Sequence, residues 1–187
     1  MKKILWIIAS AMTLAFMPAC NSENDVDLDK YTEWKEQNEA WLKEMQARKN
    51  ADGSPYYRTV VPSWNTGAYV LIHYFNDRAE TAENLSPLYT STVDVRYIGY
   101  NCEGEPFDSS SLVNTYGKLG IQRFMVNNLI QGWSIALMDM HVGDTAEIIV
   151  PYEIAYGTSL LGTIAPYSNL RFNLRLEDIY RYEANPY

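Results

Sequence analysis

A strict alternation of apolar and polar side chains is the feature that most constrains the fold of this 187-residue chain. Over residues 169–179, Leu, Phe, Leu and Leu alternate with Arg, Asn, Arg and Glu, and 92–99 and 145–150 follow the same two-residue period. Because successive side chains of a strand point to opposite faces of a sheet, each run predicts a strand with one buried and one solvated face. Runs of β-branched and aromatic residues predict two further strands, over 57–61 and 68–75.

Two segments follow helical spacing instead. Between about residues 28 and 48, large apolar side chains fall near one helical face among Glu, Lys and Gln; they are Tyr31, Trp34, Trp41, Leu42 and Met45. A shorter segment carries Leu129, Ile130, Trp133 and Leu137 at helical spacing and is closed by Gly143 and Asp144. The sequence therefore predicts an α+β fold, in which one short helix packs across the apolar face of an antiparallel sheet and an amphipathic helix precedes it.

The first twenty residues have the layout of an export signal. Lys2 and Lys3 precede an apolar run over 4–16, which is too short for a stable membrane span. The run ends with a small residue, Ala19, before Cys20, and this ending resembles the lipobox of bacterial lipoproteins. The resemblance implies cleavage after Ala19, acylation of Cys20, and a place in the bacterial cell envelope, at the outer membrane on its periplasmic or surface side. A chance or buried cysteine at this position is the alternative.

Composition and periodicity divide the chain into four parts. We expect a signal peptide over 1–19, an acidic tether over 20–29, a helical extension over 30–55 and a folded domain over 56–187. The extension would pack on that domain or hold it away from a membrane. Dimerisation through this N-terminal helix is the less favoured alternative.

The composition argues against several classes of function. With 2 His and 2 Cys, the chain has little basis for a zinc cage or for cysteine–histidine catalysis, and His73 and His141 read as core or surface residues. A formal charge of -8 argues against a nucleic-acid partner, because phosphate binding depends on Lys and Arg. We therefore expect no metal site and no nucleic acid, and chemistry that relies on the 15 Tyr, 5 Trp and 5 Phe together with carboxylates.

Short motifs follow one another in a set order between residues 68 and 179. They are Val95, Tyr97 and Gly99; Gly104 with Phe107, Asp108, Ser109 and Ser110; Leu129, Ile130, Gln131, Gly132 and Trp133; Met140, Val142 and Gly143; Ala155, Tyr156 and Gly157; and finally Ile164, Pro166 and Leu170. Their order and spacing resemble those of the FKBP family of peptidyl-prolyl cis/trans isomerases. The resemblance implies an FKBP-like antiparallel sheet wrapped around one short helix, proline-containing segments of unfolded or exported proteins as substrates, and no cofactor.

The same resemblance implies a pocket for the proline ring. Trp133 would form its floor, and its walls would be Tyr97, Phe107, Leu129, Ile130 and Phe172. The Tyr156 hydroxyl and the Ile164 backbone amide would donate hydrogen bonds to substrate carbonyls, and Asp108 would order the polar edge. The expected catalytic residues are thus Tyr97, Phe107, Asp108, Trp133 and Tyr156, and the expected substrate-binding residues are Leu129, Ile130, Ile164 and Phe172. Core packing is the alternative for Leu129 and Phe172, and a turn or helix cap is the alternative for Asp108.

Such a pocket suits isomerisation of an X-Pro bond. Rotation about this bond meets a barrier of about 18–20 kcal/mol, although the two isomers differ by only about 0.5–1 kcal/mol. A catalyst therefore has to favour the twisted amide and needs no nucleophile. Because twisting weakens the charge separation of the amide, a concave apolar site stabilises the twisted form relative to the planar form that water solvates well.

The chain departs from the family pattern at several places. A further phenylalanine is common before the helix, whereas only Phe124 is aromatic within 120–124. The other departures are Ser111, Leu112 and Val113 in place of a basic residue, Ala136 in place of a glycine, and Ala165 with Pro166 in place of a proline pair. Two other functions stay open for this reason: a non-catalytic peptide-binding protein or chaperone on the same scaffold, and an adhesion or assembly lipoprotein that uses Trp34 and Trp41 of the extra helix.

Overall fold

The computed structural model describes residues 26–115 and 117–180. Its strands are β1 Arg58–Val60, β2 Val70–Tyr74, β3 Thr92–Tyr100, β4 Pro106–Ser109, β5 Asn114–Thr115, β6 Lys118–Leu119, β7 Gln122–Met125, β8 Thr145–Val150 and β9 Leu170–Tyr180. The α-helices are α1 Thr32–Ala47 and α2 Gln131–Asp139, and the 3-10 helices are η1 Leu28–Tyr31, η2 Val126–Asn128 and η3 Tyr152–Ile154. Within the described ranges, no helix has the length and apolar character needed to cross a membrane.

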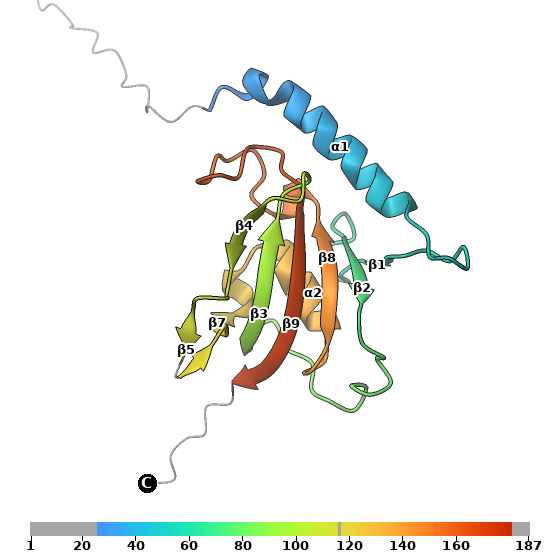
Figure 1. Ribbon diagram of the computed structural model, residues 1–187, viewed down its shortest axis with the longest axis vertical. Coiled ribbons are helices and arrows are strands. Elements are labelled where there is room, and N and C mark those ends of the chain that lie inside the picture. Colours follow the sequence, from blue (N-terminus) through green and yellow to red (C-terminus); the bar gives the residue numbers. More distant parts are fainter. Residues whose placement is uncertain (1–25, 116, 181–187) are drawn as a thin grey trace, which may run out of the picture.

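One antiparallel sheet of seven strands organises the fold. Six strands follow the order β1-β2-β8-β9-β3-β4, and β7 also pairs with β3. Strand β3 is long enough to pair with β7 along its first half and with β4 along its second, while β9 occupies its other edge. Figure 1 shows α2 behind the sheet and α1 lying across one end of the molecule. The predicted α+β fold, with a sheet around one short helix and a preceding helix, is confirmed.

The core lies between α2 and the inner face of the sheet. Alternate side chains of β8 and β9 point into it and are at most 3% exposed; they are Ala146, Ile148, Val150, Leu170, Phe172, Leu174 and Leu176. The helix lies this close to β8 because Gly132 has no side chain: a Cβ there would be 2.2 Å from Val150 Cγ1. The alternation in the sequence thus becomes a close-packed apolar layer.

The predicted strands agree with β1, β2, β3, β8 and β9 to within one or two residues. The short helix begins later than its apolar spacing indicated, because Leu129 and Ile130 precede it and Ile130 is its N-cap. Both side chains still pack against the core, since the chain turns through η2 immediately before them. Strands β4 to β7 were not predicted, because two to four residues are too few to show a period.

Part of the outer face of the sheet is buried, which corrects the expectation that this whole face is exposed to solvent. Leu71 on β2 and Ile149 on β8 point outward and are only 2% and 0% exposed. They pack against the apolar face of α1, formed by Trp41, Leu42 and Met45. The amphipathic helix predicted from the sequence is present as α1, but helical spacing alone does not show which strands it covers.

Two carboxylates on this outer face are buried because each has a partner. Asp94 is 2% exposed and accepts hydrogen bonds of 2.6 and 2.8 Å from Arg123. Glu147 accepts a hydrogen bond of 2.5 Å from the Tyr57 hydroxyl and lies 3.9 Å from Arg48 Nη1. Burial, and then the hydrogen bond to Glu147, raises the pKa of Tyr57. A buried carboxylate thus joins β8 to the segment that follows α1.

Asn38 lies in the middle of the apolar face of α1 and attaches this helix to the rest of the domain, a role that its place in the sequence does not reveal. Its Oδ1 accepts a hydrogen bond from the Asn169 N–H at 2.8 Å, and its carbonyl accepts one from Asn169 Nδ2 at 2.7 Å. Asn169 Oδ1 in turn accepts a hydrogen bond from the Tyr152 N–H at 2.8 Å. Because Asn38 is 0% exposed, water does not compete for these bonds.

The export features expected at the N-terminus lie outside the described residues: the signal peptide over 1–19, the acylation site Cys20 and residues 20–25 of the acidic tether.

Replacing Asn38 with alanine tests this attachment of α1. The change removes the side-chain acceptor of the buried Asn169 N–H, while the backbone carbonyl that accepts from Asn169 Nδ2 remains. Because a buried N–H is left without a partner, we expect the free energy of unfolding to fall by about 1–3 kcal/mol. Urea denaturation followed by tryptophan fluorescence measures the loss. The matched control is Glu36→Ala on the exposed side of α1, for which we expect a change within about 0.5 kcal/mol. Equal stability of the two variants would contradict the attachment.

Candidate functional site

An aromatic pocket opens beside the N-terminal end of α2. It has a volume of about 260 Å³ and is lined by Tyr97, Asp108, Gln122, Phe124, Asn128, Leu129, Ile130, Trp133, Tyr156 and Phe172. These residues come from β3, β4, β7, β9, α2 and the segments that flank η2 and η3. The structure therefore brings together all the expected catalytic and substrate-binding residues except Phe107 and Ile164.

Trp133 lies at the centre of this pocket with three aromatic rings standing on edge around it. Its ring is nearly perpendicular to those of Tyr97, Phe124 and Phe172, at centroid distances of 5.0, 5.9 and 5.2 Å. Edge-to-face packing of this kind holds each ring in one orientation. Trp133 itself is 4% exposed. The result is a rigid apolar box with the indole as its base.

The position of Trp133 follows from the residue before it. Gly132 and Trp133 are the second and third residues of α2, and Gly132 faces Val150 on β8 without room for a Cβ. This close approach places the first turn of α2 directly on the sheet. The indole of Trp133 then reaches the rings of β3, β7 and β9.

The polar rim of the pocket is built around Tyr97. Its hydroxyl donates a hydrogen bond of 2.8 Å to Asp108 Oδ2 and lies 3.2 Å from Gln122 Oε1. Burial raises the pKa of Tyr97, and the hydrogen bond to the Asp108 carboxylate raises it further. The hydroxyl therefore stays protonated at neutral pH and holds Asp108 at the rim, as the polar edge of the pocket.

Tyr156 supplies a second hydroxyl at this rim. It makes no hydrogen bond with another side chain or backbone group in the described part of the chain. Burial, and then the nearby charge of Asp108, raises the pKa of Tyr156, so this hydroxyl also stays protonated. A half-buried O–H without an internal acceptor is available to donate to a ligand.

Two of the expected site residues lie outside the pocket. Phe107 packs edge-on against Phe172, with centroids 5.6 Å apart, and lines a neighbouring hollow together with Ile164. The Ile164 N–H is donated to the Leu161 carbonyl at 2.9 Å. This corrects the expectation that the Ile164 amide is free for a substrate carbonyl, because the loop uses that amide to close its own turn.

Another backbone amide is better placed to donate. The Ile130 N–H stands at the start of α2 on the pocket lining, and it meets no acceptor among residues 26–115 and 117–180. The first N–H groups of a helix lack internal partners, so they are available to an incoming carbonyl. The family resemblance implies Ile130 only as an apolar wall, because nothing in a sequence shows which backbone amides stay unpaired.

Three residues of the lining were not predicted: Gln122, Phe124 and Asn128. Gln122 and Phe124 are two residues apart on β7, so their side chains lie on the same face of this strand and both reach the pocket. Phe124 provides an aromatic wall beside Trp133, whereas Gln122 brings a polar amide next to the Tyr97 hydroxyl. The side-chain amide of Gln122 therefore takes a place in the lining that an aromatic ring would take in a wholly aromatic pocket.

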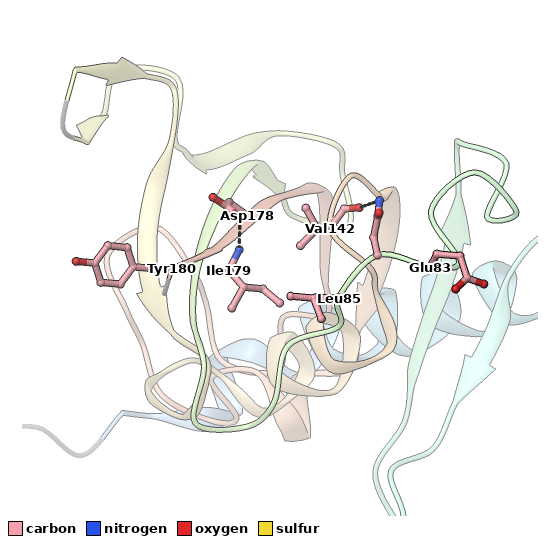
Figure 2. A pocket seen from close by; sticks show the side chains of 7 residues that line it. Glu83, Leu85, Val142, Asp178, Ile179 and Tyr180 are labelled. Carbon is pink, nitrogen blue, oxygen red and sulfur yellow. Dashed lines mark hydrogen bonds between the residues drawn. The ribbon is translucent and has the colours of Figure 1, made fainter. Parts of the chain in front are cut away.

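A larger but different hollow lies at the far end of β9. Its volume is about 560 Å³, and it is lined by Glu83, Asn84, Leu85, Val142, Asp178, Ile179 and Tyr180. Figure 2 shows Leu85 and Ile179 in its middle, with Tyr180 and Glu83 on opposite sides. It has neither the ring of aromatic side chains nor the paired hydroxyls of the Trp133 pocket. In the described part of the chain, no three His, Cys, Asp or Glu side chains are grouped as ligands for a metal.

Comparison with known proteins agrees with this geometry. Residues 85–177 match the sequence profile of the FKBP-type peptidyl-prolyl cis-trans isomerase family. The chain is 38% identical over 98 residues to the FKBP-type 22 kDa peptidyl-prolyl cis-trans isomerase of Escherichia coli K12, which covers 52% of this chain and 45% of that protein. It is also 38% identical over 91 residues to the outer membrane protein MIP of Legionella longbeachae, covering 48% and 37% of the two chains. The chain thus spans less than half the length of these relatives.

Solved structures show the same fold. The crystal structure of FkpA from Escherichia coli superimposes with a TM-score of 0.61 at 25% identity, covering 81% of this chain and 63% of that one. A peptidyl-prolyl cis-trans isomerase from Pseudomonas syringae superimposes with a TM-score of 0.60 at 22% identity, covering 84% and 98%. Residues 85–177 therefore form a domain of the FKBP-type peptidyl-prolyl cis-trans isomerase family.

Proposed function

We propose that this protein is a peptidyl-prolyl cis/trans isomerase that acts on X-Pro bonds of exported proteins. The observation that carries the proposal is the box of three rings around Trp133, with two protonated tyrosine hydroxyls at its rim. A proline ring is apolar and compact, and a box of about 260 Å³ is a suitable volume for it.

The proposed mechanism is non-covalent. The proline ring would rest on Trp133, and the Tyr156 hydroxyl and the Ile130 N–H would hold neighbouring carbonyls of the peptide. In this position the X-Pro amide lies away from bulk water, which removes the solvation that favours its planar form. Donors that are held in position need not reorganise as the amide twists. They therefore stabilise the transition state more than the ground state, which lowers the barrier.

A non-catalytic peptide-binding or chaperone function is the second candidate. One observation favours it: the polar side chain of Gln122 lies in the pocket wall beside the Tyr97 hydroxyl. This feature is compatible with binding a proline-containing segment, and it weakens only the apolar stabilisation of the twisted amide.

We also propose that the extension over 30–55 and the domain over 56–187 fold as one unit. Support comes from the buried Asn38–Asn169 pair and from Glu147, which bonds Tyr57.

The first test of the proposed function is acceleration of cis-to-trans isomerisation of a short X-Pro peptide. We expect the chain to accelerate it and Trp133→Leu to lower kcat/KM at least tenfold, because the base of the pocket is lost. Circular dichroism verifies that the variant is folded. The matched control is Trp64→Leu, since Trp64 is 54% exposed and outside the pocket. If the unmodified chain gives no acceleration over buffer but still binds the peptide, the binding function replaces the enzymatic one.

The amide in the pocket wall leads to a second prediction. Gln122→Phe adds roughly 40 Å² of apolar contact, worth about 1 kcal/mol, so we expect kcat/KM to rise about fivefold. The Tyr97 hydroxyl keeps its bond to Asp108 in this variant. Gln122→Leu, which adds a smaller apolar side chain, should give an intermediate rise. A fall in kcat/KM for both variants would show that the Gln122 amide assists the reaction.

We propose further that the protein is anchored in the bacterial envelope by acylation of Cys20. Support comes from the lipobox-like ending of the N-terminal apolar run and from similarity to a relative named an outer membrane protein. Multiple acyl chains would give stable attachment where a single chain would not.

Metabolic labelling with radioactive palmitate in a bacterial host tests the anchor. We expect label on the unmodified chain and on Cys102→Ser, which keeps Cys20. We expect no label on Cys20→Ser, because this variant lacks the acylation site. Unlabelled protein released into the soluble fraction from all three genes would disprove the anchor.

A further inference from the structure

A second hollow adjoins the Trp133 pocket and uses the N-terminal helix as one of its walls. It lies between α1, the turn from β3 to β4, and the loop before β9, with a volume of about 360 Å³. Its lining includes Trp34, Glu103, Glu105, Phe107, Ile164 and Leu170. Aromatic and aliphatic side chains thus form its interior, and two carboxylates belong to the turn at its side.

The hollow and the pocket share a wall. Phe107 lines the hollow and Phe172 lines the pocket, and their rings pack edge-on with centroids 5.6 Å apart. Gly99 beneath them makes this packing feasible, because a Cβ there would lie 2.7 Å from Phe107 and 2.8 Å from Phe172. The ring centroids across this wall are 5.6 Å apart, and an extended chain advances about 3.3 Å per residue, so we expect a peptide that leaves the pocket over this wall to reach the hollow about two to three residues from the proline.

The α1 wall is held in place before any ligand arrives. Trp34 Nε1 donates a hydrogen bond of 3.0 Å to Ser168 Oγ, and Ser168 donates one of 2.7 Å to the Ala165 carbonyl. The Asn38–Asn169 pair anchors the next turn of the same helix. Contacts with this wall therefore require little ordering of the protein on binding.

One cation lies close to the turn that carries the two carboxylates: Arg171 Nη2 would be 3.9 Å from a Cβ on Gly104, and Arg171 Nε is 4.0 Å from Glu147 Oε2. Glu103 and Glu105 are exposed, and neither forms an ion pair within the described part of the chain. Their side-chain partners are neutral amides: Gln37 Nε2 lies 3.2 Å from Glu103, and Asn101 Nδ2 lies 3.4 Å from Glu105. The nearby Lys35 is paired with another carboxylate of α1, at 3.8 Å.

From this arrangement we propose that the hollow is a specificity subsite for a lysine or arginine of the substrate, two to three residues from the isomerised proline. The aliphatic part of the basic side chain packs between Trp34 and Phe107, and its cationic end lies by Glu103 and Glu105. Long basic side chains bind in this way because their stems are apolar and their ends are charged. The proposal rests on the proposed function, since the same peptide occupies both sites.

The test compares peptides that differ only in this one side chain. Lysine, norleucine or glutamate is placed two or three residues before or after the proline, and kcat/KM is measured with the full chain in neutral detergent at about 20 mM salt. We expect lysine to exceed norleucine by about two- to fivefold on one side of the proline, the range of exposed charge pairs, with glutamate lowest. At 1 M salt the ratio should approach one, because the Debye length falls to about 3 Å.

Matched variants assign the preference to the two carboxylates. Glu103→Gln with Glu105→Gln should bring the lysine-to-norleucine ratio to about one. Glu80→Gln with Glu83→Gln changes the net charge equally at the other end of the molecule, where Glu83 lines the hollow of Figure 2, and should keep the ratio. Because the readout is the ratio of kcat/KM for the lysine and norleucine peptides, a general loss of activity in a variant does not change it.

The other outcomes of these experiments contradict either the subsite or the proposed function. A ratio of one in the unmodified chain, a ratio that survives in the Glu103 and Glu105 variant, or equal losses in both double variants would overturn the subsite. Acceleration without a lysine preference leaves the proposed function standing. If no peptide is accelerated, the proposed function fails, and calorimetric Kd values for the same peptides still decide whether lysine is preferred.

Discussion

The close approach of α2 to β8 is the constraint on which the rest of the structure depends. Glycine is the only residue type that fits at position 132, because a Cβ there would overlap the side chain of Val150. The helix can therefore cover the inner face of the sheet and place the indole of Trp133 among the rings of Tyr97, Phe124 and Phe172. Core and pocket share this one contact, so the rigidity of the pocket derives from the packing density of the core.

The N-terminal helix belongs to the same body. It buries outward-facing residues of β2 and β8, and its buried Asn38 is bonded to Asn169, which in turn holds Tyr152 at the start of the segment that carries Tyr156. A helix that looks like a spacer in the sequence thus supports a loop of the pocket. It also provides Trp34 to the neighbouring hollow, so that the extension changes the shape of the surface a peptide would meet.

The electrostatics of the site are simple. Burial and the Asp108 carboxylate raise the pKa values of Tyr97 and Tyr156, which keeps both hydroxyls protonated across the physiological range. Such a site offers hydrogen-bond donors and apolar surface and no strong nucleophile. That combination fits a reaction in which a bond rotates without being broken, and it accounts for a chain that has many aromatic residues and only 2 His.

Periodicity alone determined the α+β fold, the five longer strands and both helices, because side-chain alternation and helical spacing are local properties of the sequence. Most of the pocket lining was implied by the resemblance of the motifs to those of the FKBP family. Only the tertiary structure decided that Gln122 and Phe124 reach the pocket, that Phe107 and Ile164 lie in the adjoining hollow, and that Asn38 is buried. Each of these depends on contacts between residues far apart in the chain, whose distances and hydrogen-bond partners exist only after the sheet and helices have packed.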